Sequence, residues 1–297
     1  MTRAELVVRR PGLLTTVQDA GRPGAAHLGV SPSGALDQAA LRLANRLVGN
    51  PQDAAALETT LLGADVRLTA GRWVAVTGAG CDVAVSGRPA DGDRPLYVAP
   101  GATLSVGPAR WGVRSYVAVG GGIAVEPVLG SRSTDTLSRI GPPPLTEGDV
   151  LPLGDVRGAP AAVDVVPRSA VTGTVDVRLV PGPRDATLTA AALRTLVTHP
   201  YEVTDHSDRV GARLAGPPLE RSGDQAVPSE GIALGSVQVP RDGLPLVFLA
   251  DHPTTGGYPV VAVVHPADLW IVAQSRPGTA LRFRWHPRPA APGATGP

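Results

Sequence analysis

Short apolar runs interrupted by glycine and proline constrain the fold of this chain more than any other feature. The 297 residues include 36 glycines and 31 prolines. A short apolar run suits a buried strand, and glycine and proline favour turns, so the pattern predicts a mainly β architecture of barrels or sandwiches. The clearest runs lie at residues 6–8, 73–76, 83–85, 96–98, 116–119 and 175–179.

Two segments depart from this pattern and predict helices packed on β layers. Residues 34–47 repeat apolar side chains with a helical period and stop before Asn50-Pro51. Ser33 precedes this segment and suits its N-cap, and Asp37 falls in its first turn. Residues 187–198 carry a similar apolar stripe.

The length of the chain predicts about two domains. Residues 156–174 are rich in alanine, proline, valine and glycine, which favours a junction there. We therefore expect domains at 1–168 and 172–286 and a disordered tail at 287–297. A faint R-x-G-A-x-x-x-G repeat at 22–29 and 209–216 leaves duplication and chance both open.

Composition narrows the range of functions. The net charge is +1 with no block of like charge, so neither nucleic acid nor a membrane is expected as a partner. No apolar run approaches the length of a membrane span, and no signal-like segment opens the chain. Cys81 is the single cysteine and the six histidines lack metal-ligand spacing, so we expect no disulfide, no metal site and a cytoplasmic location.

The chain contains no lysine, because all 27 basic residues are arginines. A Schiff-base lysine, a P-loop lysine and a biotin-bearing lysine are therefore excluded from this chain. Arginine remains protonated at neutral pH and grips carboxylate or phosphate groups bidentately. Any chemistry on this chain must depend on acids, amides, hydroxyls and arginines.

The densest polar segment is the loop at 251–259, between apolar runs at 246–250 and 260–264. It offers the carboxylate of Asp251, the hydroxyls of Thr254 and Thr255, and the phenol of Tyr258. Gly256 and Gly257 would let a ligand approach the backbone closely. The loop is either a polar hairpin turn or the wall of a pocket.

Other polar residues have both a structural and a functional interpretation. Ser33-Gly34 could present backbone N–H groups to an anion, or simply cap a helix. Asn45 could point into a site, and Arg209 and Arg213 form either a surface network or a substrate clamp. Gln238 lies in an apolar strand, where its amide needs a partner.

Taken as a set, these motifs resemble the biotin-dependent carboxyltransferase family, also called allophanate hydrolase subunit 2. The matching stretches cover nearly the whole chain in family order. They are residues 12–22, 33–37, 44–50, 118–123, 130–134, 207–211, 213–214, 235–240 and 251–259.

The resemblance implies two cyclophilin-like β-barrel domains with a few short helices. It also implies a partner-dependent enzyme, since the family includes the C subunit of ATP-dependent 5-oxoprolinase. That subunit works with an A subunit and with a B subunit that resembles a kinase inhibitor. That reaction opens a cyclic amide, 5-oxoproline, to L-glutamate. ATP would bind either this chain or a partner. The family also leaves open carboxyl transfer to a urea-like amide, with biotin on another protein, and a non-catalytic regulator that binds a kinase-inhibitor-like partner.

Side-chain chemistry then suggests roles in such a reaction. The catalytic candidates are Asp251, Glu230 and Tyr258. Asp251 or Glu230 would handle protons, and Tyr258, with Gln238 and Thr255, would hydrogen-bond the amide. Arg209 or Arg213 would bind a carboxylate. The expected substrate-binding residues are Ser33, Asp37, Asn45, Arg209, Arg213, Gln238, Thr254, Thr255, Gly256 and Gly257.

Overall fold

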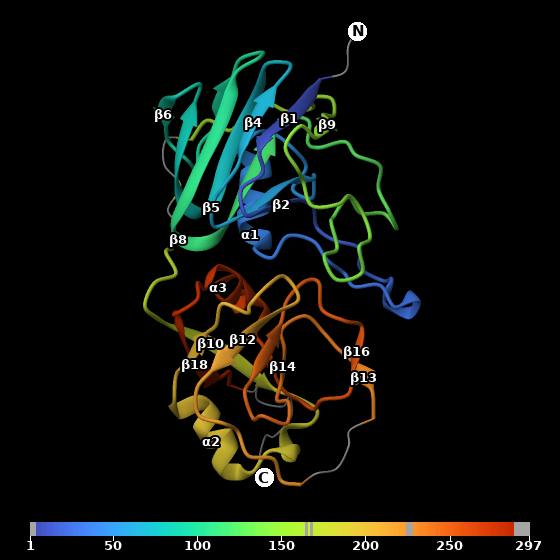
Figure 1. Ribbon diagram of the computed structural model, residues 1–297, viewed down its shortest axis with the longest axis vertical. Helices are drawn as coiled ribbons and strands as arrows, with labels where there is room; N and C mark the ends of the chain where they lie inside the picture. Colours follow the sequence, from blue (N-terminus) through green and yellow to red (C-terminus); the bar gives the residue numbers. More distant parts are fainter. Residues whose placement is uncertain (1–3, 164–165, 167–168, 224–227, 288–297) are drawn as a thin grey trace, which may run out of the picture.

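The computed structural model describes residues 4–163, 166, 169–223 and 228–287. Figure 1 shows two lobes stacked along the long axis of the molecule, each built around a β-sheet. The strands of the first lobe fall within residues 5–152 and those of the second within 174–285. Residues 288–297 of the expected tail at 287–297 lie outside the described residues. The domain boundaries at 168 and 172 stay a prediction.

The first lobe contains a nine-stranded antiparallel sheet in the order β2-β3-β8-β4-β1-β9, with β5 pairing β6, β7 and β8. Bulges between Gly78 and Val83 curl the long β5–β8 pair. The strands are β1 (Glu5–Arg10), β2 (Leu14–Gln18), β3 (Ala56–Thr60), β4 (Asp65–Leu68), β5 (Arg72–Val85), β6 (Arg88–Ala90), β7 (Leu96–Val98), β8 (Thr103–Val119) and β9 (Val150–Pro152).

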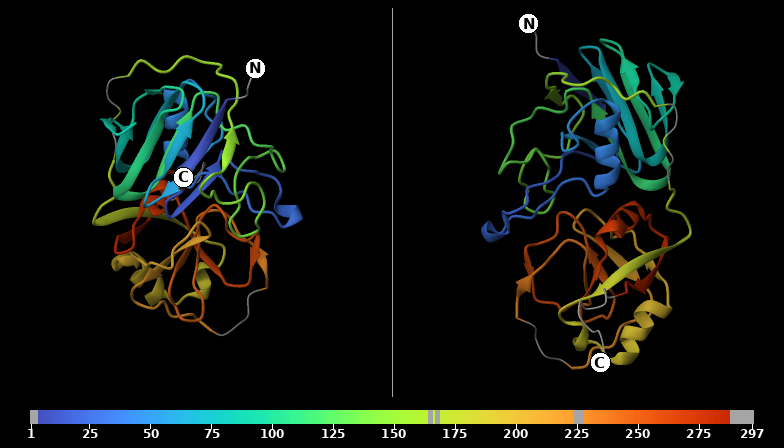
Figure 2. Two further views of the ribbon diagram at one scale, coloured as in Figure 1. Left: turned by 45° about the horizontal axis from the view of Figure 1, so that its top comes forward. Right: turned by 180° about the vertical axis from the view of Figure 1, so that it is seen from behind.

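Helix α1 (Gln38–Leu47) covers one face of this sheet, as the right view of Figure 2 shows. Its Leu41 and Leu47 are buried with Tyr116 of β8. The helix begins later than predicted: its N-cap is Asp37, whose side chain accepts a hydrogen bond from the Ala40 amide. The prediction of Ser33 as the cap was wrong.

The second lobe is a closed barrel in the order β10-β17-β14-β15-β12-β11-β18. A parallel pairing of β10 with β18 completes the closure. The apolar run that precedes the polar loop forms β15, and the run that follows it forms β17. The strands are β10 (Thr174–Pro181), β11 (Tyr201–Val203), β12 (Gly211–Ala215), β14 (Ser236–Gln238), β15 (Leu246–Phe248), β17 (Val260–Val264) and β18 (Ala280–Trp285).

Short elements decorate the barrel. Helix α2 (Ala190–Thr198) confirms the second predicted helix, with Thr189 as its N-cap. Helix α3 (Leu269–Gln274) was not predicted, and it lies between the two lobes in Figure 1. Strands β13 (Glu230–Gly231) and β16 (Thr255–Gly256) form a separate two-stranded ladder. The remaining elements are the 3-10 turns η1 (Ala26–Leu28), η2 (Asp185–Thr187) and η3 (Pro266–Asp268).

The mainly β prediction is confirmed, but only the second lobe is a closed barrel among the described strands. In the first lobe, an irregular segment takes the place of a closing strand pair. Thr134 and Leu145 donate backbone hydrogen bonds to β2, and Ala124 donates one to Pro152 of β9. This segment therefore hydrogen-bonds to both edge strands, β2 and β9, which do not pair with each other. It also carries Asp135 and Thr136 toward the second lobe.

The two copies of the faint repeat adopt different local structures. Residues 22–29 form a loop containing η1, whereas 209–216 lead into β12. Both begin at a buried arginine, Arg22 or Arg209. Within the described residues, no helix is long and apolar enough to span a membrane.

Candidate functional site

A buried ionic network centred on Arg209 joins the two lobes. Arg209 precedes β12 and is 1% exposed. Its Nε and Nη2 donate to the two carboxylate oxygens of Asp251, at 2.9 and 3.1 Å. Its Nη1 donates to Glu58 of β3, and its Nη2 also donates to the Gly34 carbonyl at 2.7 Å. The guanidinium therefore binds one acid from each lobe.

Glu58 is fully surrounded by donors. Its Oε2 accepts from the Tyr116 hydroxyl at 2.7 Å and from the Leu36 amide at 3.0 Å. Burial, together with the charge of Glu58, raises the pKa of the Tyr116 phenol well above its usual value, so the phenol stays protonated as a donor. The Glu58 side chain is buried, at 1% exposure.

Asp251 is also saturated with hydrogen bonds. Besides Arg209, it accepts from the Thr136 amide at 2.9 Å and the Thr136 hydroxyl at 2.7 Å. Burial alone would raise the pKa of the Asp251 carboxyl, but the charge and hydrogen bonds of Arg209 outweigh burial and lower it. An acid with a lowered pKa and occupied oxygens is a weak base and a strong partner for Arg209.

Gln274 of α3 forms a second bridge between the lobes. Its Nε2 donates to Asp37 at 3.0 Å and to the Arg114 carbonyl at 2.9 Å. Its Oε1 accepts from the amides of Val113 and Arg114, both at 2.9 Å. Burial raises the pKa of Asp37, which also caps α1. Sequence reasoning did not select Gln274 as a site residue, although an amide within an apolar run was a usable signal.

Two cavities lie beside the network and share Leu249. The larger, of about 610 Å³, is lined by Arg114, Thr136 and Arg209 among others. The smaller, of about 400 Å³, is lined by residues of the Ser33 turn, the first turns of α1 and the segment around Trp270. The interface thus has space for small molecules next to the network.

Ser33 lies at the wall of the 400 Å³ cavity in a left-handed conformation, with φ of 50°. Its amide donates to the Ala250 carbonyl at 3.0 Å. Gly21 crosses this turn so closely that a Cβ on Gly21 would lie 2.7 Å from the Ser33 carbonyl oxygen, and one on Gly34 would lie 2.8 Å from the Gly21 nitrogen. The crossing fixes Ser33 although its hydroxyl is buried without a hydrogen-bond partner.

The rest of the polar loop gathers at another part of the barrel. Strand β16 pairs with β13, so Gly256 lies opposite Glu230 (Figure 1). The buried Gln238 amide donates to the Tyr258 carbonyl at 2.9 Å, whereas the Tyr258 side chain is 44% exposed. Glu230 Oε2 accepts from Arg184 at 3.1 Å, and its Oε1 is buried without a partner. The remaining loop residues, Thr254, Thr255 and Gly257, belong to the same segment.

Two predicted site residues lie away from these clusters. Asn45 is buried within α1, where its Nδ2 donates to the carbonyls of Gln52 and Ala54 at 3.3 and 2.7 Å. It thereby ties the helix end to the following turn. Arg213 lies on β12 and is exposed. The substrate roles predicted for both stay predictions.

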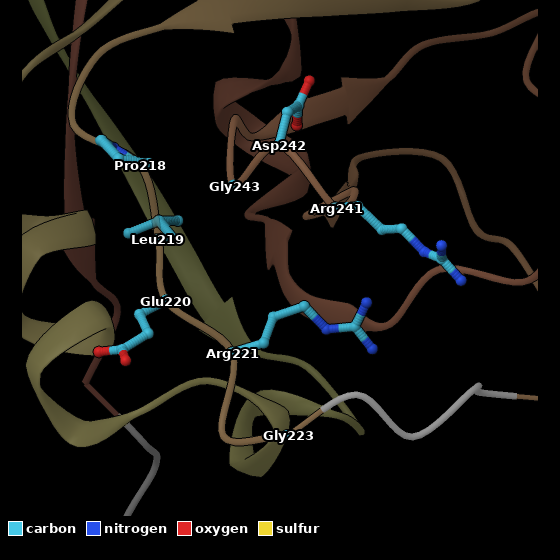
Figure 3. A pocket seen from close by; sticks show the side chains of 8 residues that line it. All are labelled: Pro218, Leu219, Glu220, Arg221, Gly223, Arg241, Asp242 and Gly243. Carbon is cyan, nitrogen blue, oxygen red and sulfur yellow. The ribbon is translucent and has the colours of Figure 1, made fainter.

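A third cavity, of about 690 Å³, lies in the second lobe between residues 218–223 and 241–243. Figure 3 shows the side chains of Arg221 and Arg241 extending to the same side, while Glu220 points away from them. No predicted site residue is among its described lining residues. In the described part of the chain, no group of three or more histidine, cysteine, aspartate or glutamate residues is arranged to hold a metal ion.

This chain belongs to the carboxyltransferase domain family, subdomains A and B, which matches residues 28–285. Within it, the chain is a homologue of the C subunit of 5-oxoprolinase. It is 39% identical to that protein of Escherichia coli over 281 residues, covering 94% of this chain and 90% of the relative. The corresponding 5-oxoprolinase protein of Haemophilus influenzae is 33% identical, with coverage of 90% and 87%.

Solved structures agree with this placement. A crystal structure of TTHA0988 superposes with a TM-score of 0.87 at 39% identity, covering 95% of this chain but 56% of that one. The urea amidolyase of Kluyveromyces lactis superposes with a TM-score of 0.89 at 29% identity, covering 95% of this chain and 19% of that one. This chain therefore corresponds to part of each of these longer proteins.

Proposed function

We propose that the chain is the C subunit of an ATP-dependent 5-oxoprolinase, which opens 5-oxoproline to L-glutamate together with the A and B subunits. The observation that carries this proposal is the 39% identity to the Escherichia coli protein over 94% of this chain and 90% of that protein. Near-full-length similarity favours the same place in the same assembly. The accompanying expectations are two cyclophilin-like lobes, a hetero-oligomer and a cytoplasmic location.

The reaction needs an activated lactam. In the proposed sequence, the lactam oxygen takes the γ-phosphoryl group of ATP and ADP leaves. Water then attacks the ring carbon and the C–N bond breaks, with the nitrogen leaving as the amine, which gives γ-glutamyl phosphate. A second water hydrolyses this acyl phosphate to L-glutamate and phosphate. The chain has no lysine and no nucleotide motif, which favours ATP binding on a partner or at a shared interface. Nucleotide titration of the A and B subunits without this chain, compared with the assembled complex, separates these two possibilities.

The contacts suggest a division of roles among the predicted residues. The donors of Arg209 are occupied by Asp251, Glu58 and a carbonyl, so we propose that Arg209 and Asp251 position the site rather than touch the substrate. Glu230 has an oxygen without a partner and is the better proton acceptor. Gln238 and Tyr258, from the same polar cluster, would orient the water or the amide.

The test is reconstitution of the chain with the A and B subunits, ATP and 5-oxoproline. We expect glutamate and phosphate in equal amounts, and only when all three proteins are present. Glu230→Gln should lower kcat by about 10²-fold or more, the range of a general base. The exposed Glu202, on β11 of the same lobe, provides a matched Glu→Gln control that leaves kcat unchanged. Absence of glutamate from the complete mixture would reject the proposal.

Carboxyl transfer to a urea-like amide is a second candidate. The family description and the superposition on urea amidolyase favour it. Biotin would then arrive on another protein, since this chain has no lysine to carry it. A biotinylated carrier, bicarbonate, ATP and a biotin carboxylase should give carboxylated urea with this chain if the second candidate is right. Tight binding to the kinase-inhibitor-like partner without either reaction would favour a regulator instead.

A further inference from the structure

We propose that the 400 Å³ cavity beside α1 is the binding site for the cyclic amide, with Arg42 holding its carboxylate and Ser33 and Gln38 binding its amide group. This inference rests on the proposed function and names the place and orientation of the substrate. The cavity lies between the Ser33 turn and α1 of the first lobe and Ala250 and Trp270 of the second.

Unpartnered polar atoms are the first observation. The Ser33 hydroxyl and the Gln38 Oε1 are both buried without a hydrogen-bond partner. Buried polar groups nearly always have partners, because an unmade hydrogen bond leaves the cost of desolvation uncompensated. Both residues line the same cavity. A ligand that offers one acceptor and one donor would satisfy both groups.

The two groups are held in fixed orientations. Gln38 Nε2 donates to the carbonyls of Ala35 and Asp19, at 3.0 and 3.4 Å, which leaves its Oε1 as an acceptor only. Ser33 is fixed by its bond to Ala250 and by the close crossing of Gly21. A five-membered lactam presents its N–H and its C=O on the same side. The N–H can donate to Gln38, and the carbonyl can accept from Ser33.

Arg42 supplies the charge. It lies one helical turn after Gln38 on the same face of α1, and it also lines the cavity. Its side chain is exposed, and it is the single charged residue among the described lining residues, so no acid of the cavity wall competes for it. A guanidinium without a competing acid favours a carboxylate, which it binds bidentately.

The apolar walls suit the remainder of the ligand. Leu234, Leu249 and Trp270 line the same space and would exclude water from the ring methylenes. The Arg209 network supports the Ser33 turn, since Arg209 holds the Gly34 carbonyl directly after Ser33. This gives a reason for the position of a buried network next to the cavity.

The test is a cycle of protein and substrate changes in the assembled three-protein complex. The variant is Arg42→Gln, and the control is Arg46→Gln, an exposed arginine one turn later on α1 that is not among the described lining residues. The second substrate is 2-pyrrolidone, which has the lactam but no carboxylate. Wild type should use 5-oxoproline with a kcat/KM at least about tenfold above that for 2-pyrrolidone, since a charge-assisted pair is lost.

Arg42→Gln should raise KM for 5-oxoproline by about tenfold to a hundredfold and remove the preference over 2-pyrrolidone. Arg46→Gln should keep KM within about twofold, as expected for a surface change. The proposal is overturned if Arg42→Gln leaves KM unchanged, or if it impairs both substrates equally.

A failure of the proposed function gives a different result. If the wild-type complex forms no glutamate, calorimetric titration of the full chain and of the complex with 5-oxoproline tests the cavity directly. Binding by wild type that Arg42→Gln abolishes and Arg46→Gln retains would support the site. Absence of binding, or equal binding by all three, would overturn it.

Discussion

Two polar clusters at the same lobe interface differ in one respect, the completeness of their hydrogen bonds. Around Arg209, two acids, a phenol and a threonine are all hydrogen-bonded, and the buried Nε of the neighbouring Arg114, which makes no hydrogen bond, still lies 3.6 Å from Glu58. Around the 400 Å³ cavity, Ser33 and Gln38 each have a buried atom without a partner. The first cluster joins the two lobes, whereas the unpartnered atoms of the second are the basis of the proposed ligand site. Each prediction below changes one cluster and compares it with a matched position.

The largest effect is expected for Arg209→Gln. Removing the guanidinium leaves Asp251 buried without a cationic partner and leaves Glu58 with only the more distant Arg114 guanidinium, at 3.6 Å, which should lower the free energy of unfolding by about 3–5 kcal/mol. Arg213→Gln makes the same change at an exposed position of β12 and should change the free energy of unfolding by less than about 0.5 kcal/mol. Urea denaturation of both variants measures the difference. Equal effects would mean that the network contributes no more than a surface arginine.

Gln274→Leu should have the next largest effect. It removes the partner of Asp37 and of the Val113 and Arg114 amides, and should cost about 1–3 kcal/mol of stability. Gln38→Leu is the matched change in the other cluster. Gln38→Leu removes the two Nε2 bonds to the carbonyls of Ala35 and Asp19 but no bond at Oε1, whereas Gln274→Leu removes four bonds, so we expect a smaller cost for Gln38→Leu, measured by thermal denaturation. A larger cost for Gln38→Leu would contradict the comparison.

The pH dependence of stability should report on His252, next to Asp251. Burial lowers the pKa of its imidazole, although the Pro253 carbonyl, Asp251 and Asp135 act in the opposite direction. Below pH about 6.5 the folded protein therefore binds fewer protons than the unfolded chain. The contribution of the neutral His252 to the free energy of unfolding is complete above that pH and is lost as the pH falls. One such group changes stability by at most about 1.4 kcal/mol per pH unit.

Unfolding free energies measured between pH 5 and 8, a range of about three units around the reference histidine pKa, test this expectation. His252→Asn should flatten the slope, while the exposed His206→Asn should leave it as in wild type. An unchanged slope in His252→Asn would show that other groups cause the pH dependence.

The smallest effect on stability should come from Ser33→Gly. The change removes a hydroxyl without a partner and relieves the backbone strain of a serine in the left-handed region. It also raises the conformational entropy of the unfolded chain, which opposes these gains. The free energy of unfolding should therefore stay within about 1 kcal/mol of wild type. Ser31→Gly, two residues earlier, removes a buried hydroxyl that donates to Ala250 at 2.8 Å and should be more destabilising. The reverse order in thermal denaturation would contradict the assignment of the two clusters.

The sequence predicted several of the strands and two of the helices because their signals are local. The apolar runs around the polar loop became β15 and β17, and the stripe at 187–198 became α2. It missed α3, a helix of six residues that is too short to show a clear period. It also placed the start of α1 at Ser33, since a serine and an aspartate in the same segment are both good caps.

The candidate site was only partly predictable for a different reason. Arg209 and Asp251 were selected as polar residues in informative motifs, but their partners were not. Glu58 lies 151 positions from its partner Arg209, and Thr136 lies 115 positions from its partner Asp251. No periodicity relates residues so far apart. Arg42 gave no signal either, because an arginine on an amphipathic helix is usually an ordinary solvated residue.

The sequence by itself determined the β-rich fold, the absence of lysine chemistry and the family. Turn residues, residue types and ordered motifs depend only on which residues follow one another along the chain. The tertiary structure decided which polar side chains are satisfied. Arg209 and Ser33 both come from family-like motifs, yet one is fully bonded and the other has a buried hydroxyl without a partner. Hydrogen bonding depends on the distance between atoms in space, and only folding brings the two lobes together around them.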